Sequence, residues 1–423
     1  MRRSMLFCVA ALIVSASAAR AGDWPGWRGP HGDGTSDEKS VPVKWSATDN
    51  VAWKTPIPGK GHSSPIVCGD RVFLTTCLEQ DAKRPDDKVG RVLLCLDRRD
   101  GSVLWQKEVI SAKLEKLHRL NSRASSTPAT DGKHVFVTFL DASKDRDARV
   151  VVGCYDFDGR RVWQKSPGRF SSVHGFCSSP LLYKDTVIVN CDHDGDGYVV
   201  CLAAATGEQR WRIDRPNKTR SYCAPIIVEA AGRKQLVLSG SKCVAGYDPD
   251  TGKRWWIIDG PTEQFVSSLV FLDNTFFLTA GFPTYHYMGI RPDGEGNVTR
   301  THVAWHHEVK NSRQGAYVPS PIAFDKWFFA VSDDGVLNCF DAKGGEWKWH
   351  EKLGKHHSAS PVLADGHLYF TADNGDTYVL KAGEKFEVVG VNPLGEEVYS
   401  SPAVAGGQLF IRGDKHLFCI GKR

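Results

Sequence analysis

The 423-residue sequence lacks any long apolar run after its first 21 residues, and no later stretch approaches the ~18 apolar residues of a membrane helix. We therefore do not expect an integral membrane protein. It also lacks a strong excess of one charge. Its formal net charge is +5, and removing three arginines with the first 21 residues leaves 51 − 49 = +2. No cluster of Lys and Arg with interleaved aromatic residues occurs, so nucleic acid is not an expected partner.

Short catalytic motifs are missing too. The sequence contains no Gly-x-Ser-x-Gly, no His-Glu-x-x-His and no phosphate-binding loop, so hydrolase and nucleotide chemistry have no support. Carboxylates that meet only in three dimensions would leave no such motif. An enzyme is therefore not the leading expectation.

What the sequence does contain is a repeat. Its members share a Cys or Gly, an Asp/Gly turn, and a Trp four residues after the turn Gly. They are Cys95 to Trp105, Cys154 to Trp163, Cys201 to Trp211, Gly246 to Trp256 and Cys339 to Trp349. A period of roughly 40–50 residues that ends in a Trp-bearing strand is typical of a β-propeller.

A second marker runs in phase with the first, a Ser-rich step into Pro followed by an apolar strand. Its copies begin at Ser63, Ser126, Ser178, Cys223, Ser267, Pro319, Ala359 and Ser400. Proline is tolerated at the first residue of a strand and holds the preceding residue extended, so each copy marks the start of a strand.

The two ends of the chain complete each other. The last copy runs from Ser400 to Cys419 without reaching a Trp, whereas Trp53 precedes the first copy. We expect Val51–Lys54 to supply the outer strand of that last blade, which would leave no exposed sheet edge. Two blades look degenerate: one reaches Trp305 after an inserted turn, and one has Phe386 in place of Trp. The predicted fold is all-β, an eight-bladed β-propeller of four-stranded antiparallel blades over residues 46–423.

The N-terminus has the features of a secretory signal. Arg2 and Arg3 precede an apolar run from Met5 to Val14, and the segment ends in Ala19-Arg20-Ala21. We expect residues 1–21 to be a cleaved signal peptide and residues 22–45 an N-terminal tail, from which Gly22–Pro42 could be deleted without loss of the fold. The mature protein is expected to be soluble and periplasmic or extracellular.

Twelve cysteines in an exported chain suggest disulfides. Five of them, however, share one register: Cys95, Cys154, Cys201, Cys339 and Cys419. Neighbouring sheets stack at roughly 10 Å, too far apart for a disulfide between equivalent positions. We therefore expect these five to be buried thiols. Whether a disulfide forms among Cys68, Cys77, Cys177, Cys191, Cys223 and Cys243 stays open.

The combination of the two markers resembles the PQQ-like (pyrroloquinoline-quinone-like) repeat of quinoprotein alcohol dehydrogenases and of the propeller that assists outer-membrane protein assembly. It is also similar to uncharacterised exported propellers that begin like Trp24-Pro25-Gly26-Trp27-Arg28-Gly29-Pro30 and have a segment like His118 to Pro128. Such proteins are of a planctomycete type. A quinoprotein dehydrogenase is expected to have adjacent cysteines against its cofactor, and no Cys-Cys pair occurs here. We therefore expect neither quinone nor calcium as a cofactor.

The residues just before the strand starts are expected to line the mouth of the axial channel. They are His62, Arg123, His174, Tyr222, Gln264, Tyr317, His357 and Tyr399. Such hydrogen-bonding and aromatic side chains grip polar ligands or peptides, although a channel mouth is also polar simply because it is wet. The basic segment 107–123 is expected to cover this mouth.

Two metal sites were weighed. His62, His174, His356 and His357 come from different blades, and a zinc site needs side chains that meet at one point. Asp192 to Gly197 opens like a calcium loop, but Ala203 stands where a Glu ligand is required, and a tight hairpin explains the same residues. No metal site is predicted.

The expected function is that of an exported, non-catalytic propeller scaffold, a monomer that binds a protein, peptide or polar ligand at the channel mouth. The protein or peptide partner would lie in the cell envelope. The alternative is a quinoprotein-type oxidoreductase or a sugar-processing enzyme that uses the same face.

Overall fold

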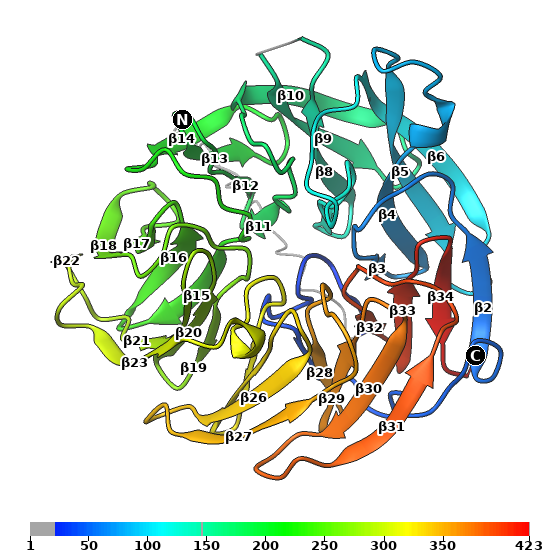
Figure 1. The fold of residues 1–423 in the computed structure, drawn as a ribbon. Coiled ribbons are helices and arrows are strands. Elements are labelled where there is room, and N and C mark those ends of the chain that lie inside the picture. The colour runs from blue at the N-terminus through cyan, green and yellow to red at the C-terminus, as the bar shows by residue number, and fades with distance from the viewer. Residues whose placement is uncertain (1–21, 145–146, 423) are drawn as a thin grey trace, which may run out of the picture.

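The protein is a ring of eight sheets around a central axis (Figure 1). The computed structural model describes residues 22–144 and 147–422, so the expected signal segment lies outside the described residues. Within those ranges no helix is long and apolar enough to cross a membrane. Each sheet has four antiparallel strands, to which a short parallel strand is added in two of them, and the predicted eight-bladed propeller is confirmed.

The first four blades contain the following strands in order from the axis outward. Blade 1 has β3 (Ile66–Cys68), β4 (Arg71–Cys77), β5 (Val89–Asp97) and β6 (Val103–Ala112); blade 2 has β7 (Ala129–Thr130), β8 (His134–Asp141), β9 (Arg149–Asp156) and β10 (Arg161–Arg169); blade 3 has β11 (Leu181–Tyr183), β12 (Thr186–Cys191), β13 (Tyr198–Ala203) and β14 (Gln209–Asp214); blade 4 has β15 (Ile226–Ala230), β16 (Arg233–Gly240), β17 (Cys243–Tyr247) and β18 (Arg254–Asp259).

The other four blades follow the same order. Blade 5 has β19 (Val270–Leu272), β20 (Thr275–Ala280), β21 (Tyr285–Ile290) and β23 (Val303–Val309); blade 6 has β24 (Ile322–Phe324), β25 (Trp327–Val331), β26 (Val336–Asp341) and β27 (Trp347–Lys352); blade 7 has β28 (Val362–Ala364), β29 (His367–Thr371), β30 (Asp376–Lys381) and β31 (Val388–Pro393); blade 8 has β32 (Ala403–Ala405), β33 (Gln408–Arg412), β34 (His416–Ile420) and β2 (Val51–Pro56).

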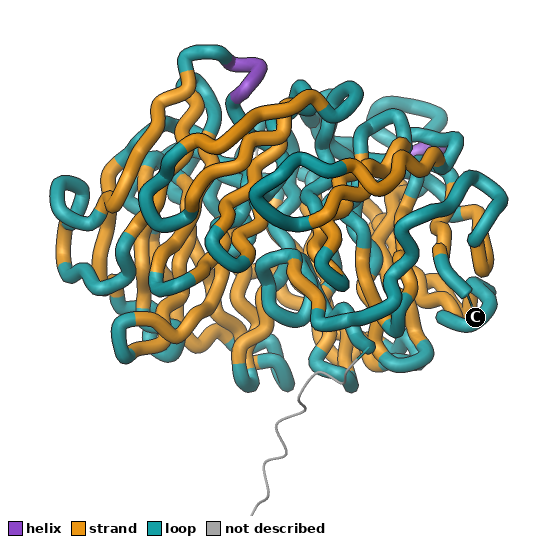
Figure 2. The backbone as a smooth tube through the Cα atoms, turned by 90° about the horizontal axis from the view of Figure 1, so that it is seen from below, coloured by secondary structure: helices purple, strands orange, loops and turns teal. Residues whose placement is uncertain are grey.

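Three short additions complete the elements. β1 (Thr35–Ser36) pairs in parallel with β28, and β22 (Gly296–Asn297) pairs in parallel with β18. The two 3-10 helices, η1 (Glu79–Asp81) and η2 (Ser312–Gln314), lie in loops. Figure 2 shows the ring from the side, with strands running between two faces of loops and both 3-10 helices on one of them.

The closure of the ring is as predicted. β2 pairs antiparallel with β34, and Trp53 lies opposite Cys419 in this ladder. The N-terminal strand thus forms the outer strand of blade 8, so that residues from both ends of the propeller share one sheet (Figure 1).

The repeated Trp joins each blade to the next. The indole N–H donates to a backbone carbonyl of the following blade for Trp53 (to Arg98, 2.9 Å), Trp105 (Phe157, 3.0 Å), Trp163 (Ala204, 2.7 Å), Trp211 (Pro249, 3.1 Å), Trp305 (Ala342, 3.0 Å) and Trp349 (Glu384, 2.5 Å). The turn Gly of the following blade lies against the indole ring. A Cβ added to Gly101, whose φ is +74°, would lie 2.4 Å from the Trp53 ring. Trp256 is the exception, since it donates to Gln235 in its own blade, but it still packs on Phe276 of blade 5.

The five cysteines in register are all buried, with 0% exposure, as predicted. Each lies directly opposite a Trp on the neighbouring outer strand: Cys95 and Trp105, Cys154 and Trp163, Cys201 and Trp211, Cys339 and Trp349, and Cys419 and Trp53. Cys95, Cys154, Cys201 and Cys339 are free thiols. The cysteine fills the small space beneath the indole, where Gly246 and Gly289 stand in blades 4 and 5.

One detail of the degenerate blades differs from expectation. Phe386 does not occupy the Trp position of blade 7, because Gly390 is the residue opposite Val379 there. Phe386 lies before β31 and packs edge-on against Trp349 of blade 6, with ring centroids 5.5 Å apart. Phe386 therefore packs against the Trp of blade 6 and does not take the place of a Trp in blade 7.

Residues 22–45 are not a loose tail. Trp24 is 2% exposed and forms a bridge with Val67, and Val41 and Trp45 belong to the same hydrophobic cluster as blade 8. Thr130, in blade 2, donates its backbone N–H to the Pro25 carbonyl. This segment, dark blue in Figure 1, crosses the centre of the ring at one end of the channel and contacts blades on both sides of the ring. We therefore expect its deletion to destabilise the fold.

Arg28 is the anchor of this segment. Its side chain is buried, and the guanidinium donates to the carbonyls of Pro361, Pro321 and Asp33, each at 2.5 Å. Pro321 and Pro361 begin the inner strands of blades 6 and 7, so one side chain ties two blades to the N-terminal segment. Burial lowers the pKa of Arg28 to about 10, which leaves it charged at neutral pH.

Candidate functional site

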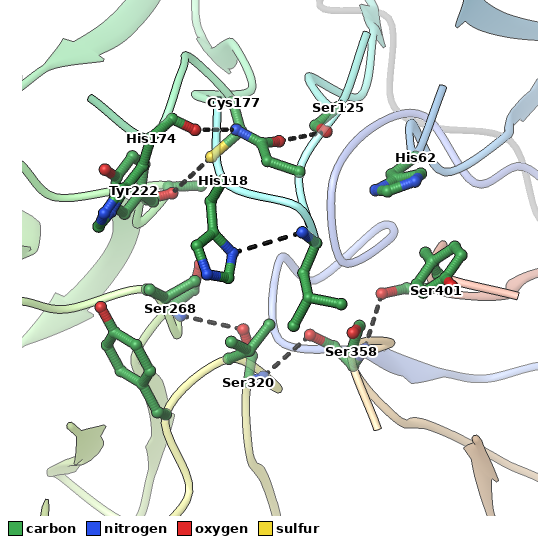
Figure 3. Close-up of a pocket in the computed structure, with 18 of the residues that line it drawn as sticks. His62, His118, Ser125, His174, Cys177, Tyr222, Ser268, Ser320, Ser358 and Ser401 are labelled. Carbon is green, nitrogen blue, oxygen red and sulfur yellow. Dashed lines mark hydrogen bonds between the residues drawn. The ribbon is translucent and has the colours of Figure 1, made fainter. Parts of the chain in front are cut away.

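A cavity of about 550 Å³ lies on the axis, on the face where the inner strands begin. Its walls come from the residues that precede the inner strands of most blades, and Figure 3 shows their side chains converging on one space. Trp27 lines this cavity and also a second hollow bounded by Gly26, His31 and Tyr183. The N-terminal segment thus forms the floor between the two.

Six of the eight predicted mouth residues line the cavity. They are His62, His174, Tyr222, Gln264, Tyr317 and Tyr399, from blades 1, 3, 4, 5, 6 and 8. The propeller brings them together because each precedes an equivalent inner strand. The structure places them at the predicted mouth, and their binding role stays a prediction.

Arg123 and His357 do not line the cavity, and their assignment to the mouth is corrected. Arg123 donates to Glu79 at 2.9 Å and to the Glu115 carbonyl at 2.5 Å, and these contacts hold it at the side of blade 1. His357 has 0% exposure and its Nδ1 lies 3.0 Å from the Lys355 carbonyl. Arg123 is thus held by its own loop and by the loop between β4 and β5, and His357 by its own loop.

Sequence reasoning missed several lining residues. Trp27, Phe282 and Asp333 come from segments without the Ser-Pro marker nearby, so no local signal pointed to them. His118, Leu120 and Asn121 belong to the loop after β6, and here the expectation that segment 107–123 reaches the mouth is confirmed. Asn121 fixes this loop by donating to the His174 carbonyl at 2.7 Å.

Aromatic pairs form two walls of the cavity. His62 stacks on Tyr399 with ring centroids 4.6 Å apart, and His174 stacks on Tyr222 at 6.3 Å. His118 meets His174 edge-on at 5.4 Å. These contacts hold the rings as rigid apolar surfaces. The Tyr222 hydroxyl is bonded to Ser172 and the Tyr399 hydroxyl to Glu397, each at 3.0 Å.

A ring of hydroxyl groups lies deeper in the cavity. The residue two positions before the inner strand is a Ser or Thr in seven blades. In six of these blades its backbone N–H donates to the hydroxyl of the equivalent residue in the next blade. The chain of bonds runs from Ser268 to Ser320, Ser360, Ser401, Ser64, Thr127 and Ser179, at 2.9–3.0 Å. It breaks at Ala224 of blade 4, which has no hydroxyl. Trp27 donates to Ser268 at 3.2 Å and so links the floor to this ring of hydroxyl groups.

The ionisable groups of the cavity are restrained. Burial lowers the pKa of His62 to about 4, and the pKa of His174 is also lowered by burial, so both are neutral at pH 7. Burial raises the pKa of the Cys177 thiol to about 12, which removes it as a nucleophile. Arg220 is paired with Asp194 at 2.5 Å.

Asp333 is the one carboxylate in the lining. Its Oδ1 accepts the backbone N–H groups of Tyr317 and Val318 at 3.1 and 2.9 Å. Burial raises its pKa to about 6, against the opposing effect of these hydrogen bonds. Asp333 therefore serves first to hold the loop that carries Tyr317.

The lining does not fit a quinone held over calcium. It contains no Glu, its only Asn is Asn121, which is bonded to His174 and Ser125, and its only Cys is Cys177. No group of three or more His, Cys, Asp or Glu within the described parts of the chain could hold a metal ion.

Two residues of the candidate metal sites have other partners. In the calcium-like loop, Asp192 is buried and paired with Arg215 at 2.9 Å. His356 lies 2.7 Å from Asp373, which accounts for one of the four histidines considered for zinc.

The family comparison matches most of the chain. A family model described as outer membrane protein assembly factor BamB matches residues 36–142, 88–274, 297–389 and 333–420. The matched ranges overlap, as expected for a repeat, and together omit only the ends and residues 275–296.

Individual relatives are more distant. A lanthanide-dependent methanol dehydrogenase of Methylacidiphilum fumariolicum (strain SolV) is 28% identical over 165 residues, which are 36% of this chain and 24% of the dehydrogenase. The match therefore spans about a quarter of that protein's length.

Two solved structures illustrate the likeness of fold. BamB of Moraxella catarrhalis has a TM-score of 0.60 at 12% identity and covers 88% of this chain and 96% of its own. A quinohemoprotein alcohol dehydrogenase of Comamonas testosteroni has a TM-score of 0.65 at 13% identity and covers 98% and 83%. At these identities the likeness concerns the fold alone.

Proposed function

The chain belongs to the PQQ-like β-propeller family described as outer membrane protein assembly factor BamB, and from this premise we propose that it is an exported, non-catalytic binding propeller. Its ligand, a polar molecule or the polar end of an envelope protein or peptide, occupies the axial cavity. The protein works without quinone or calcium, in the periplasm or outside the cell.

One observation carries the proposal: six side chains from six blades converge on a cavity that the N-terminal segment closes below. A concave site of this volume, with aromatic walls and a few hydrogen-bonding groups, is the usual form of a small-ligand site. Its neutral histidines, its high-pKa thiol and its paired Arg220 supply binding groups and no activated nucleophile.

A second function has one observation in its favour. Asp333 is a carboxylate with a pKa raised to about 6 inside a cavity, which is a property of catalytic acids and bases. An oxidoreductase or sugar-processing activity would use it as the proton acceptor. The two backbone bonds that it accepts favour a positioning role over this one.

The experiment compares ligand capture by cavity variants. The full chain, exported and purified, is incubated with an envelope extract, and bound molecules are identified by native mass spectrometry. Tyr222→Ala should lose the bound species. Tyr183→Ala, which removes a half-buried tyrosine from the opposite end of the channel, is the matched control and should keep it. Equal capture by both variants would refute the cavity as the binding site.

A further inference from the structure

We infer that the axial cavity binds an uncharged carbohydrate, an inference that rests on the proposed function and names its ligand class. Three properties of the lining lead to it: the pairing of its charges, the flat faces of its aromatic walls and the donor–acceptor character of its hydroxyl ring.

The charges come first. Arg220 is neutralised by Asp194, and Asp333 already accepts two backbone N–H groups. A ligand anion would compete with Asp194 for Arg220, and it would be desolvated beside Asp333. Since burying a charge without a partner is costly, the cavity favours a neutral ligand.

The aromatic walls supply the apolar part of recognition. The His62–Tyr399 and His174–Tyr222 pairs each present ring surfaces to the cavity. Aromatic faces carry partial negative charge, and the C–H groups on one side of a sugar ring carry partial positive charge. A sugar ring can therefore pack flat on such a wall while its hydroxyl groups point sideways.

The hydroxyl ring supplies the polar part. Each of Ser320, Ser360 and Ser401 accepts a backbone N–H from the preceding blade. A hydroxyl has one proton and two lone pairs, so each retains one donor and one acceptor. A sugar hydroxyl offers the same two functions, whereas an ammonium only donates and a carboxylate only accepts. The match is to polyhydroxylated neutral rings.

An organic cation is the competing ligand class. An aromatic cage for a quaternary ammonium needs aromatic rings and a nearby carboxylate. The cavity contains both, in Tyr222, Tyr317, Trp27 and Asp333. The Asp333 carboxylate, however, already accepts the backbone N–H groups of Tyr317 and Val318, so less of its charge is available to a cation. The carbohydrate is therefore favoured, and the cation becomes an outcome of the test.

The test is an array of uncharged oligosaccharides probed with the full exported chain, with hits measured by isothermal titration calorimetry. Choline and trigalacturonate serve as charged probes. At least one neutral oligosaccharide should bind with one-to-one stoichiometry. Tyr222→Ala and Tyr399→Ala should each weaken this binding at least tenfold, whereas Tyr183→Ala should not. Asp333→Asn is measured with choline, because it removes the carboxylate charge that a bound cation would need.

The outcomes separate the inference from the proposed function. Choline binding that is lost in Asp333→Asn, or trigalacturonate binding, overturns the carbohydrate. If no neutral oligosaccharide binds but extract ligands are still captured in a Tyr222-dependent way, the carbohydrate is wrong and the binding function stands. If neither occurs, both are wrong.

Discussion

Replacing Arg28 with alanine tests whether the N-terminal segment is part of the propeller. The guanidinium satisfies three buried carbonyl groups, those of Pro321, Pro361 and Asp33. Loss of each hydrogen bond costs about 1 kcal/mol, and charge-assisted bonds cost more. Burying the cation costs free energy and offsets part of the stabilisation by these hydrogen bonds, as the lowering of its pKa to about 10 indicates. We expect Arg28→Ala to lower the free energy of unfolding by about 3 kcal/mol, within the range for a broken buried polar network.

The assay is urea denaturation of the full exported chain followed by tryptophan fluorescence. Arg28→Met keeps most of the side-chain volume but removes the charge and the hydrogen bonds, as Arg28→Ala does, so the difference between the two variants measures the effect of the space left behind. Arg160→Ala is the control, because Arg160 is 80% exposed and lies 3.9 Å from Asp158. Its effect should stay within about 0.5 kcal/mol. Midpoints for Arg28→Ala and Arg160→Ala that coincide would refute the anchoring role.

Three further predictions concern the blades and the buried histidines. Trp163→Ala should destabilise the protein by about 3–5 kcal/mol, and Trp163→Phe by less, since it loses chiefly the bond to Ala204; equal denaturation midpoints for both and wild type would contradict interblade docking. Cys95, Cys154, Cys201 and Cys339 should resist thiol reagents in the native protein and all react when it is unfolded without reductant, as mass spectrometry of the labelled peptides can show. Burial lowers the pKa of His357 from 6.5 to about 4, so the unfolded chain binds a proton before the folded one. The contribution of His357 to stability should be constant above pH 6.5 and fall between pH 6.5 and 4, by on the order of 3 kcal/mol. His357→Gln should reduce that fall in denaturation series at several pH values, and a slope like that of wild type would exclude the residue as its source.

The candidate site was predictable only in part. His62, His174, Tyr222, Gln264, Tyr317 and Tyr399 could be found because each stands at a fixed distance before a strand start, and the ring symmetry of a propeller brings such positions together. The same rule misplaced Arg123 and His357. Their backbone positions follow the rule, but Glu79, Glu115 and the Lys355 carbonyl hold the side chains elsewhere. Side-chain pairing between loops leaves no periodic mark.

The amino-acid sequence by itself determined the architecture, including the blade number, the closure by Val51–Lys54 and the burial of the cysteines beneath the indoles. The blade number and the cysteine burial follow from contacts within one repeat, so their marks recur at the repeat period. The closure could be predicted because the last repeat lacks the Trp strand that stands before the first. Only the tertiary structure decided what closes the channel. Arg28 meets Pro361 across 333 positions of the chain, and Trp27 meets Ser268 across 241. Each of these contacts occurs once, so no repeated sequence pattern predicts it. They form because ring closure brings blades that are distant in the sequence around one axis.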